Sequence, residues 1–276
     1  MKSKRFLACL CACLMMLGMF SCIAWADAVT EITDKAGFAA VRANLSGNYR
    51  LETDLIFTEA DFAPGGVLAD EGEGFLPFGL TKKVDEHETC YEAVPFTGTF
   101  DGNNHKISGL KIRLVSSSEN TTVNHLGLFA LNQGIITGLT LENADFDLQS
   151  VKTPEAYVYD FICGGIAARN AGTIERCTVS GKINVDVQSE IGRVVIGSFA
   201  GRNEGTIKNC VSSVRLTSSV EQEKNAIWMG GMVGYNAEQA TLENLFFNGE
   251  ALHSAMGDQT CYIGEAAAWN IGKIYH

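Results

Sequence analysis

A short alternation of apolar and small positions ends at an asparagine and recurs five times along the chain. In each copy the residue four places before the asparagine is apolar and the residue two places before it is small, and this period of two predicts a β-strand. The apolar positions are Leu128, Ile166, Phe199, Met232 and Ala266, and the small positions are Ala130, Ala168, Gly201, Gly234 and Ala268. The asparagines are Asn132, Asn170, Asn203, Asn236 and Asn270, at spacings of 38, 33, 33 and 34 residues. Such a regular spacing is typical of stacked repeats.

The residues after each asparagine predict a corner and then a second strand. A glycine stands two places after four of the asparagines, at Gly134, Gly172, Gly205 and Gly272, and gives the backbone freedom that a tight corner needs. The second strand begins at Ile136, Ile174, Ile207, Leu242 or Ile274. No helical period lies between these strands, so the units are not strand-helix-strand crossovers. We therefore expect an all-β protein whose repeats are the coils of a parallel β-helix, a solenoid.

The residues before the repeats predict an end cap and a first strand. Thr33 or Asp34 can cap a short helix from Lys35 to Asn44, which Gly47 stops, and this helix would close the N-terminal end of the stack. Residues 49–57 alternate as a strand. Residues 59–95 are expected to form a long irregular excursion and residues 149–158 a second one, and loops of this length are either functional or mobile.

The repeat units resemble those of the GLUG family of bacterial exported proteins. Residues 197–210 read Gly-Ser-Phe-Ala-Gly-Arg-Asn-Glu-Gly-Thr-Ile-Lys-Asn-Cys, residues 164–177 are similar, and residues 96–112 resemble the segment that leads into such coils. The unit at 231–254 departs from the pattern, with two extra residues after Asn236 and Leu245 in place of cysteine. The resemblance implies a right-handed parallel β-helix in an adhesin-like or protease-associated polypeptide at the cell surface or outside the cell. It implies no catalytic residue.

The N-terminus has the pattern of an export signal. Lys2, Lys4 and Arg5 precede an apolar run from residue 6 to residue 20, and Ala24-Trp25-Ala26 is a small-x-small cleavage site. We expect a signal peptide at 1–26, a cap and irregular leading region at 27–112, and GLUG-like coils at 113–276 with the last coil incomplete. The alternative is processing as a lipoprotein, with a lipid anchor at Cys22. No later stretch approaches the ~20 apolar residues of a spanning helix, so we expect an exported protein without a transmembrane span: secreted, periplasmic or at the cell surface.

Composition and charge narrow the classes of partner. Hydrophobic residues make up 46% of the chain and charged residues 19%, which is a globular composition. The formal net charge is −11, so the chain has no surplus of cations with which to neutralise phosphates. This balance argues against a nucleic-acid partner.

Two rows of residues, each with one residue per coil, are expected to have structural roles. Stacked about 4.8 Å apart, the five asparagines can form a ladder of side-chain amides. Cys177 and Cys210 would stack in the same way, either as free buried thiols in the core or as a disulfide, which an oxidising compartment permits.

One further row is a candidate binding surface. The residues just before the asparagines are expected to point outward, and they include the strip Arg169, Arg202, Tyr235 and Trp269. Arginine and aromatic side chains are enriched in binding hot spots, so the strip is a candidate contact for a glycan or a surface protein. A solvated surface without a partner is the alternative for this row.

No residue pattern assigns catalysis, a metal or a cofactor. The histidines lack metal-ligand spacing, and the cluster at 85–88 is expected to be a solvated loop. The turn at 101–104 lacks the alternation of a calcium loop. Some parallel β-helices degrade polysaccharides, but the carboxylates of these coils, among them Asp145 and Asp147, are scattered along the sequence.

The sequence therefore predicts a non-enzymatic binding or adhesion module. A polysaccharide lyase or hydrolase is the first alternative, and a structural fragment of a larger surface protein is the second. The last unit stops at Tyr275 and His276, so we also expect an open final coil whose unpaired edges allow end-to-end self-association.

Overall fold

The computed structural model describes residues 28–69, 75–84, 89–116, 121–122, 124–150, 160–188, 192–220, 226–255 and 260–275. The predicted signal peptide, Cys22, the cluster at 85–88 and most of the excursion at 149–158 lie outside the described residues. Within those residues the chain is nearly all β, with two short α-helices. Its parallel coils stack into a β-solenoid of about four turns, as expected from the repeats.

The strands fall into a leading group and a coil group. The leading strands are β1 (Val29–Ile32), β2 (Asn48–Leu51), β3 (Leu55–Ile56), β4 (Leu80–Val84), β5 (Thr89–Ala93), β6 (Thr99–Asp101), β7 (Lys106–Ser108), β8 (Lys111–Ser116) and β9 (Thr121–Thr122). The coil strands are β10 (His125–Leu126), β11 (Phe129–Asn132), β12 (Ile135–Thr137), β13 (Thr140–Ser150), β14 (Phe161–Gly164), β15 (Ala167–Asn170), β16 (Thr173–Glu175), β17 (Thr178–Val187), β18 (Arg193–Gly197), β19 (Ala200–Asn203), β20 (Thr206–Val220), β21 (Ala226–Gly230), β22 (Val233–Asn236), β23 (Thr241–Phe247), β24 (Glu250–Ala255), β25 (Thr260–Gly264), β26 (Ala267–Asn270) and β27 (Lys273–Tyr275).

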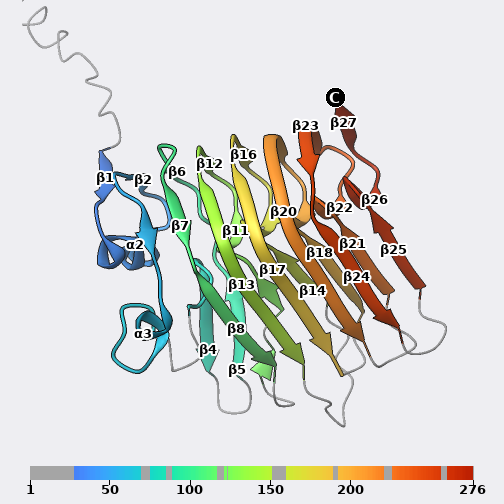
Figure 1. Ribbon diagram of the computed structural model, residues 1–276, viewed down its shortest axis with the longest axis horizontal. Helices are drawn as coiled ribbons and strands as arrows, with labels where there is room; N and C mark the ends of the chain where they lie inside the picture. The colour runs from blue at the N-terminus through green and yellow to red at the C-terminus, as the bar shows by residue number, and fades with distance from the viewer. Residues whose placement is uncertain are drawn as a thin grey trace, which may run out of the picture.

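Three parallel sheets form the walls of the solenoid. The long sheet has 14 strands and includes β13, β17 and β20. The second sheet has the order β10-β14-β18-β21-β25, and the third has the order β11-β15-β19-β22-β26. Figure 1 shows the coils following one another along the long axis, from the N-terminal end in blue to the C-terminal end in red. Neighbouring coil strands in each sheet are therefore one repeat apart in the sequence.

The strand before each asparagine starts one residue later than its pattern suggests. The apolar residue four places before the asparagine lies in the bend between the second and third sheets, and the strand begins with the next residue, which is also buried, as at Phe129 and Ala200. The small position is explained by a contact between sheets. A Cβ atom on Gly201 would lie 2.7 Å from Cγ2 of Ile162, and one on Gly234 would lie 2.7 Å from Cγ1 of Val195. The third sheet thus lies close against the outward side chains of the second.

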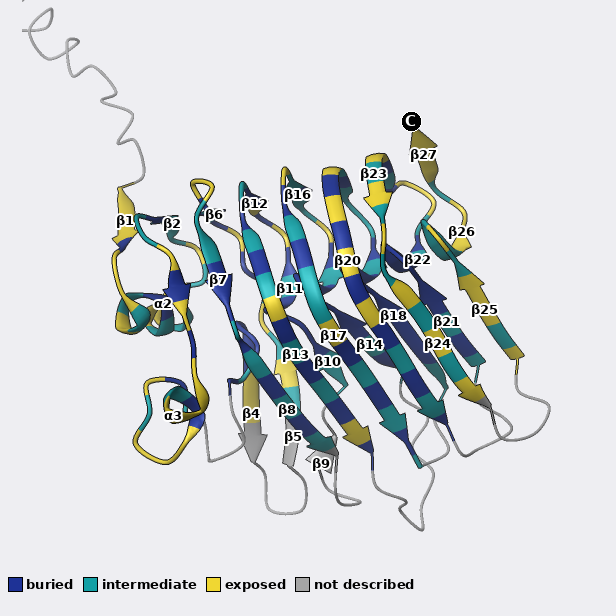
Figure 2. Ribbon diagram, viewed as in Figure 1, coloured by how far each residue is buried: buried dark blue, intermediate teal, exposed yellow. Residues whose placement is uncertain are grey.

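The core is a set of inward rows, one residue per coil. Phe100, Ile136, Ile174, Ile207 and Leu242 are fully buried and aligned in register along the long sheet. Leu139, Cys177 and Cys210 form a second buried row after the next corner. Figure 2 shows the buried positions alternating with partly exposed ones along the strands, as the period of two requires.

The corner before this second row adopts a left-handed backbone in every coil where it is described. Gly138, Arg176, Asn209 and Asn244 have φ angles of 60°, 52°, 55° and 50°. Register pairs place these residues one above another. Glycine and asparagine tolerate this conformation well, and arginine does so at a cost.

An aromatic cluster and a helix close the N-terminal end. Helix α2 (Lys35–Ala40) is capped by Asp34, whose side chain accepts a hydrogen bond from the Gly37 amide at 2.7 Å. The expected helix to Asn44 is shorter, because a 3-10 turn, η1 (Val41–Ala43), follows α2. Phe38 points into the end of the stack, and its ring lies 5.0 to 5.7 Å from those of Phe57, Phe75 and Phe78.

The leading region is more regular than predicted. Residues 49–57 form two strands, β2 and β3, rather than one. The segment 59–95 is not simply irregular, because it contains helix α3 (Glu59–Phe62) and an antiparallel pair formed by β4 and β5. Phe62, Phe75 and Phe78 bring this segment into the core. These three phenylalanines stand in a segment whose loops are polar, so the sequence pattern does not identify them as part of the core.

The C-terminal end of the stack is open in the described structure. Ile274 is 37% exposed although its counterparts in earlier coils are fully buried, and Ile263 and Tyr275 are more exposed still. Figure 2 shows this end largely in yellow. The expected end-to-end association stays a prediction. No helix among the described residues is long and apolar enough to cross a membrane.

Candidate functional site

The five asparagines stand in one hydrogen-bonded ladder along the stack. Nδ2 of each side chain donates to Oδ1 of the next at 2.8 Å, from Asn132 to Asn170, then to Asn203, Asn236 and Asn270. The first four side chains are fully buried. Several also hold the corner that follows, since Oδ1 of Asn132 accepts from the Gly134 amide at 3.1 Å. The ladder therefore satisfies polar groups at a buried corner and offers no group to a ligand.

Cys177 and Cys210 are free thiols in the described structure, without the alternative disulfide. Both are buried and lie in the core row between Leu139 and Leu245. Sγ of Cys177 lies 3.2 Å from the carbonyl of Glu175, and Sγ of Cys210 lies 3.1 Å from that of Lys208. The contact with Cys210, and then burial, raise the pKa of the Cys177 thiol well above its usual value. These thiols are suited to packing rather than nucleophilic chemistry.

The four residues of the predicted strip lie one above another in the third sheet. Arg169 pairs in register with Arg202, Arg202 with Tyr235, and Tyr235 with Trp269. All four are at least partly exposed, and Trp269 is the most exposed at 39%. The structure thus brings the strip together along one line parallel to the stack.

A second line of side chains, from the second sheet, joins the strip. Trp228 stacks on Tyr235 with ring centroids 5.5 Å apart and on Trp269 at 5.4 Å. Tyr262 meets Trp269 edge to face at 5.3 Å. Two arginines cover the rings on the N-terminal side, Arg202 over Tyr235 at 4.9 Å and Arg193 over Trp228 at 4.8 Å. We call these six residues the stacked column: Arg193, Arg202, Trp228, Tyr235, Tyr262 and Trp269.

Acidic side chains fix the cationic part of the column. Glu204 bonds both Arg169, at 3.0 Å, and Arg202. Burial alone would raise the pKa of Glu204, but the two arginines outweigh it and the pKa is lowered. Arg193 is held by Asp160 through a 3.0 Å hydrogen bond from Nε. The column is therefore an ordered surface rather than a row of freely moving side chains.

Sequence reasoning found the strip but missed Arg193, Trp228 and Tyr262. The alternation that points Trp228 outward can be seen in the sequence, because the apolar Ile227 and Met229 stand on either side of it. Both of these residues are buried in the core. Which outward row of one sheet meets which outward row of another depends on the bend between them. That bend cannot be inferred from a period of two.

The surroundings of Arg169, at the N-terminal end of the strip, are polar. His125 is nearly buried, and burial, followed by the charge of Arg169, lowers its pKa to about 4. Nδ1 of His125 lies 2.7 Å from Oδ1 of Asn124, while Nε2 has no hydrogen-bond partner among the described residues. The imidazole is therefore neutral at neutral pH. Groups of three or more potential metal ligands are absent from the described ranges.

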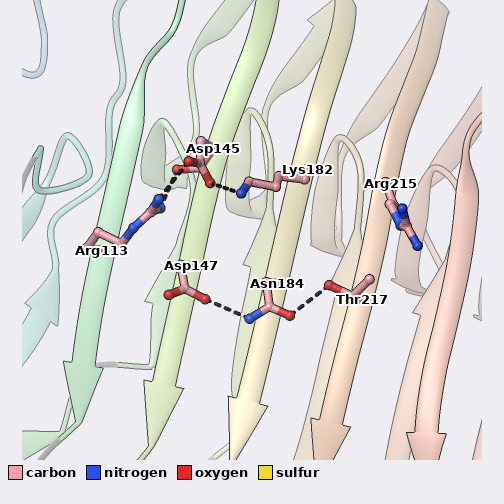
Figure 3. A pocket seen from close by; sticks show the side chains of 7 residues that line it. All are labelled: Arg113, Asp145, Asp147, Lys182, Asn184, Arg215 and Thr217. Carbon is pink, nitrogen blue, oxygen red and sulfur yellow. Dashed lines mark hydrogen bonds and ion pairs between the residues drawn. The ribbon is translucent and has the colours of Figure 1, made fainter. Parts of the chain in front are cut away.

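A polar groove crosses the outer face of the long sheet. Its volume is about 410 Å³, and its walls come from four successive coils, on β8, β13, β17 and β20. Figure 3 shows the lining side chains, which are Arg113, Asp145, Asp147, Lys182, Asn184, Arg215 and Thr217. Carboxylates that looked scattered in the sequence are thus brought beside cations by the stacking of the coils.

Hydrogen bonds order most of this groove. Asp145 accepts from Arg113 at 2.6 Å and pairs with Lys182 at 3.2 Å. Below this pair, Asn184 donates to Asp147 at 2.7 Å and accepts from Thr217 at 2.7 Å (Figure 3). Burial would raise the pKa of Asp145, but Arg113 and Lys182 outweigh it, so the pKa lies below its usual value. Asp145 is therefore a carboxylate at neutral pH.

Asp145 does not have the protonation state of the acid in a glycosidase pair. Such a pair needs one carboxylic acid with a raised pKa to protonate the leaving oxygen. Asp145 has a lowered pKa, and its neighbour Asp147 is held by Asn184 and by Gln149 at 2.9 Å. What this arrangement can do is present ordered charges and hydrogen-bonding groups to a polar ligand.

Comparison with known proteins gives two similarities. The chain is 31% identical over 150 residues to Halomucin from Haloquadratum walsbyi (strain DSM 16790 / HBSQ001), which covers 54% of this chain and 1% of Halomucin. The chain thus spans about one hundredth of the length of that relative. A second similarity is to a solved structure from Bacteroides ovatus, assigned as an immunoglobulin A1 protease. The superposition covers 89% of this chain and 85% of the other chain, with a sequence identity of 13% and a TM-score of 0.39. No known protein-family profile matches the chain, so membership of the GLUG family stays a prediction.

Proposed function

We propose that this chain is a non-enzymatic binding module of an exported or cell-surface protein and that it contacts glycan through the stacked column. The observation that carries the proposal is the ordered aromatic surface formed by Trp228, Tyr235, Tyr262 and Trp269. Aromatic rings and arginines dominate the free energy of many interfaces. Here both kinds of side chain lie in one column that spans three successive coils.

Pre-ordering is the physical advantage of this surface. Each ring of the column is fixed by a neighbour from an adjacent coil or sheet, and Glu204 and Asp160 hold the arginines. A ligand that binds here orders few additional side chains, and the entropy cost of immobilising rotamers is a main cost of binding. The half-exposed rings of Tyr262 and Trp269 are the most accessible part of the column.

A glycan suits this surface better than an apolar peptide does. Sugar rings present C–H groups that lie against aromatic faces and hydroxyls that bond to charged groups at the rim. The column supplies both, with aromatic rings toward the C-terminal end and Arg193 and Arg202 on the other side of them. Sites with apolar walls and a few placed polar groups are typical of small-ligand recognition.

The setting is part of the proposal. The basic and apolar residues 2–20 and the cleavage pattern at 24–26 support export. The similarity of 150 residues to a protein named Halomucin also supports a surface or secreted setting.

A glycan array and a panel of matrix proteins test the proposal. The variant Tyr235→Ala/Trp269→Ala removes the central and the last ring of the column, and Phe246→Ala/Tyr275→Ala is the matched control, with exposed aromatics on the long sheet. We expect the column variant to lose glycan binding while the control retains it. Circular dichroism and thermal melting must show that both variants stay folded. Binding by the wild type to none of the probes, or equal binding by the column variant, would refute the proposal.

The enzymatic alternative has one supporting observation, the presence of Asp145 and Asp147 in one groove that cations also line. It is tested by measuring release of reducing ends or unsaturated products from neutral and acidic polysaccharides, with and without added calcium. Turnover that disappears in Asp147→Asn would establish the enzyme and overturn the non-enzymatic assignment.

A further inference from the structure

Three cations, from three of the four successive coils, lie in the groove on the long sheet. Arg113 is on β8, Lys182 on β17 and Arg215 on β20. They outnumber the lining carboxylates, Asp145 and Asp147, by one. The lining of the groove thus has one positive charge in excess, whereas the whole chain carries a net charge of −11, and Glu250, outside the lining, is paired with Arg215.

Two of the cations are direct neighbours across the sheet. Lys182 and Arg215 are register partners on adjacent parallel strands. Strands lie about 4.8 Å apart, and like charges directly opposite one another are destabilising. Asp145 partly offsets this repulsion, but it is already shared between Arg113 and Lys182. Among the described residues, the ion pair that Arg215 makes is a long contact of 3.5 Å to the exposed Glu250. An oxyanion seated between Lys182 and Arg215 would relieve the repulsion.

The floor of the groove supplies hydrogen bonds beside this cation pair. The chain from Asp147 through Asn184 to Thr217 fixes the orientation of an amide and a hydroxyl. Because Thr217 donates its hydroxyl proton to Asn184, its oxygen is left as an acceptor toward the groove. In Figure 3 these groups lie along a line parallel to the row of charges. Such a floor matches the hydroxyls of a sugar ring.

From these contacts we infer that the groove is a second binding site, for a saccharide that carries a carboxylate or a sulfate group. The oxyanion lies between Lys182 and Arg215, and the ring hydroxyls bond to Thr217 and Asn184. Charge-assisted hydrogen bonds are roughly twice as strong as neutral ones, so the acidic group supplies most of the affinity. The site shares no residue with the stacked column and does not depend on the proposed function.

Calorimetric titration of the full chain with three oligosaccharides tests the inference. The probes are an oligogalacturonate, which carries carboxylates, a heparin-derived oligosaccharide, which carries sulfates, and neutral cellohexaose. The test variant is Lys182→Gln/Arg215→Gln. Its control is Lys106→Gln/Lys208→Gln, which removes the same charge from the same sheet outside the groove. Trp269→Ala separates the groove from the column.

We expect at least one acidic probe to bind the wild type and to lose affinity by about tenfold or more in the test variant, with a change under about twofold in the control. Comparing the carboxylated with the sulfated probe identifies which oxyanion the groove takes. The affinity of the acidic probe should be unchanged in Trp269→Ala. The inference is overturned if neither acidic probe binds, if cellohexaose binds equally well, or if the control loses as much affinity as the test variant. Loss of binding in Trp269→Ala alone would assign the acidic probe to the column instead.

Discussion

Replacing the central asparagine of the ladder gives the sharpest test of what holds the coils together. Asn203 is fully buried, donates to Oδ1 of Asn236 at 2.8 Å and accepts from Nδ2 of Asn170 at 2.8 Å. In Asn203→Ala both of these neighbours lose their principal partner in a place that water does not reach. We expect Asn203→Ala to be much more destabilising than a change at the end of the ladder.

The magnitude follows from the groups that are left without a partner. Each buried polar group without its hydrogen bond costs about 1–3 kcal/mol, so two such groups reduce the free energy of unfolding by about 2–6 kcal/mol. Nδ2 of Asn170 retains longer contacts of 3.3 and 3.4 Å to the carbonyls of Gly172 and Thr206, so we expect a loss in the lower part of that range, about 3 kcal/mol. Asn270 is exposed, and water replaces it as a partner of Asn236, so Asn270→Ala should cost less than about 1 kcal/mol.

Urea denaturation followed by tryptophan fluorescence and circular dichroism measures both variants. Asn203→Asp is the size-matched control, because it keeps the shape and an acceptor but removes the donor to Asn236. It should destabilise at least as much as Asn203→Ala. Equal losses in Asn203→Ala and Asn270→Ala, or a loss under about 1 kcal/mol at position 203, would show that the ladder does not contribute the assigned hydrogen-bond energy.

Three further predictions concern the backbone, the groove and the thiols. Gly138 has φ near 60°, and the nearest atom to an added Cβ is 3.5 Å away, so Gly138→Ala should cost about 1–2 kcal/mol by urea denaturation through backbone conformation alone, with Gly138→Asn costing less. The lowered pKa of Asp145 means that its ion pairs stabilise the fold above the unfolded pKa and that this contribution is lost as the pH falls through the folded pKa. Asp145→Asn should therefore lower the melting temperature at neutral pH but not at a pH below the folded pKa, and a constant difference at all pH values would contradict this. Burial raises the pKa of the Cys163 thiol well above its usual value, and Cys177 and Cys210 are equally buried. Iodoacetamide with mass spectrometry should therefore label the half-buried Cys261 before these three. Rapid native labelling of Cys177 would argue against the buried core row.

Several local features could be predicted from the residues because they depend on near neighbours in the sequence. The period of two identified the buried rows, and the glycine after each asparagine marked the corner. The spacing of about 33 residues is enough to place Arg169, Arg202, Tyr235 and Trp269 in one line. Asp34 was one of two expected helix caps, and it is the one that caps α2.

Other features depended on contacts that the repeat pattern does not describe. The predicted irregular excursion contains a helix and a strand pair, because Phe62, Phe75 and Phe78 anchor it in the aromatic end of the core. The start of each strand before an asparagine moved by one residue, since the sheets bend there and the small position meets a neighbouring sheet. These outcomes depend on the packing of segments that are distant in the sequence.

The sequence by itself determined that this protein is a stack of parallel coils, because a repeated alternation at a fixed spacing can bury its apolar rows only by placing one repeat on the next. Tertiary structure alone decided which outward rows meet. The bend between two sheets brings Trp228 and Tyr262 to the strip, and the stacking of four coils gathers Arg113, Asp145, Lys182 and Arg215 into one groove. The physical reason is that burial repeats with the local period of the chain, whereas contact between surface rows is set by the angles of corners and the register between coils.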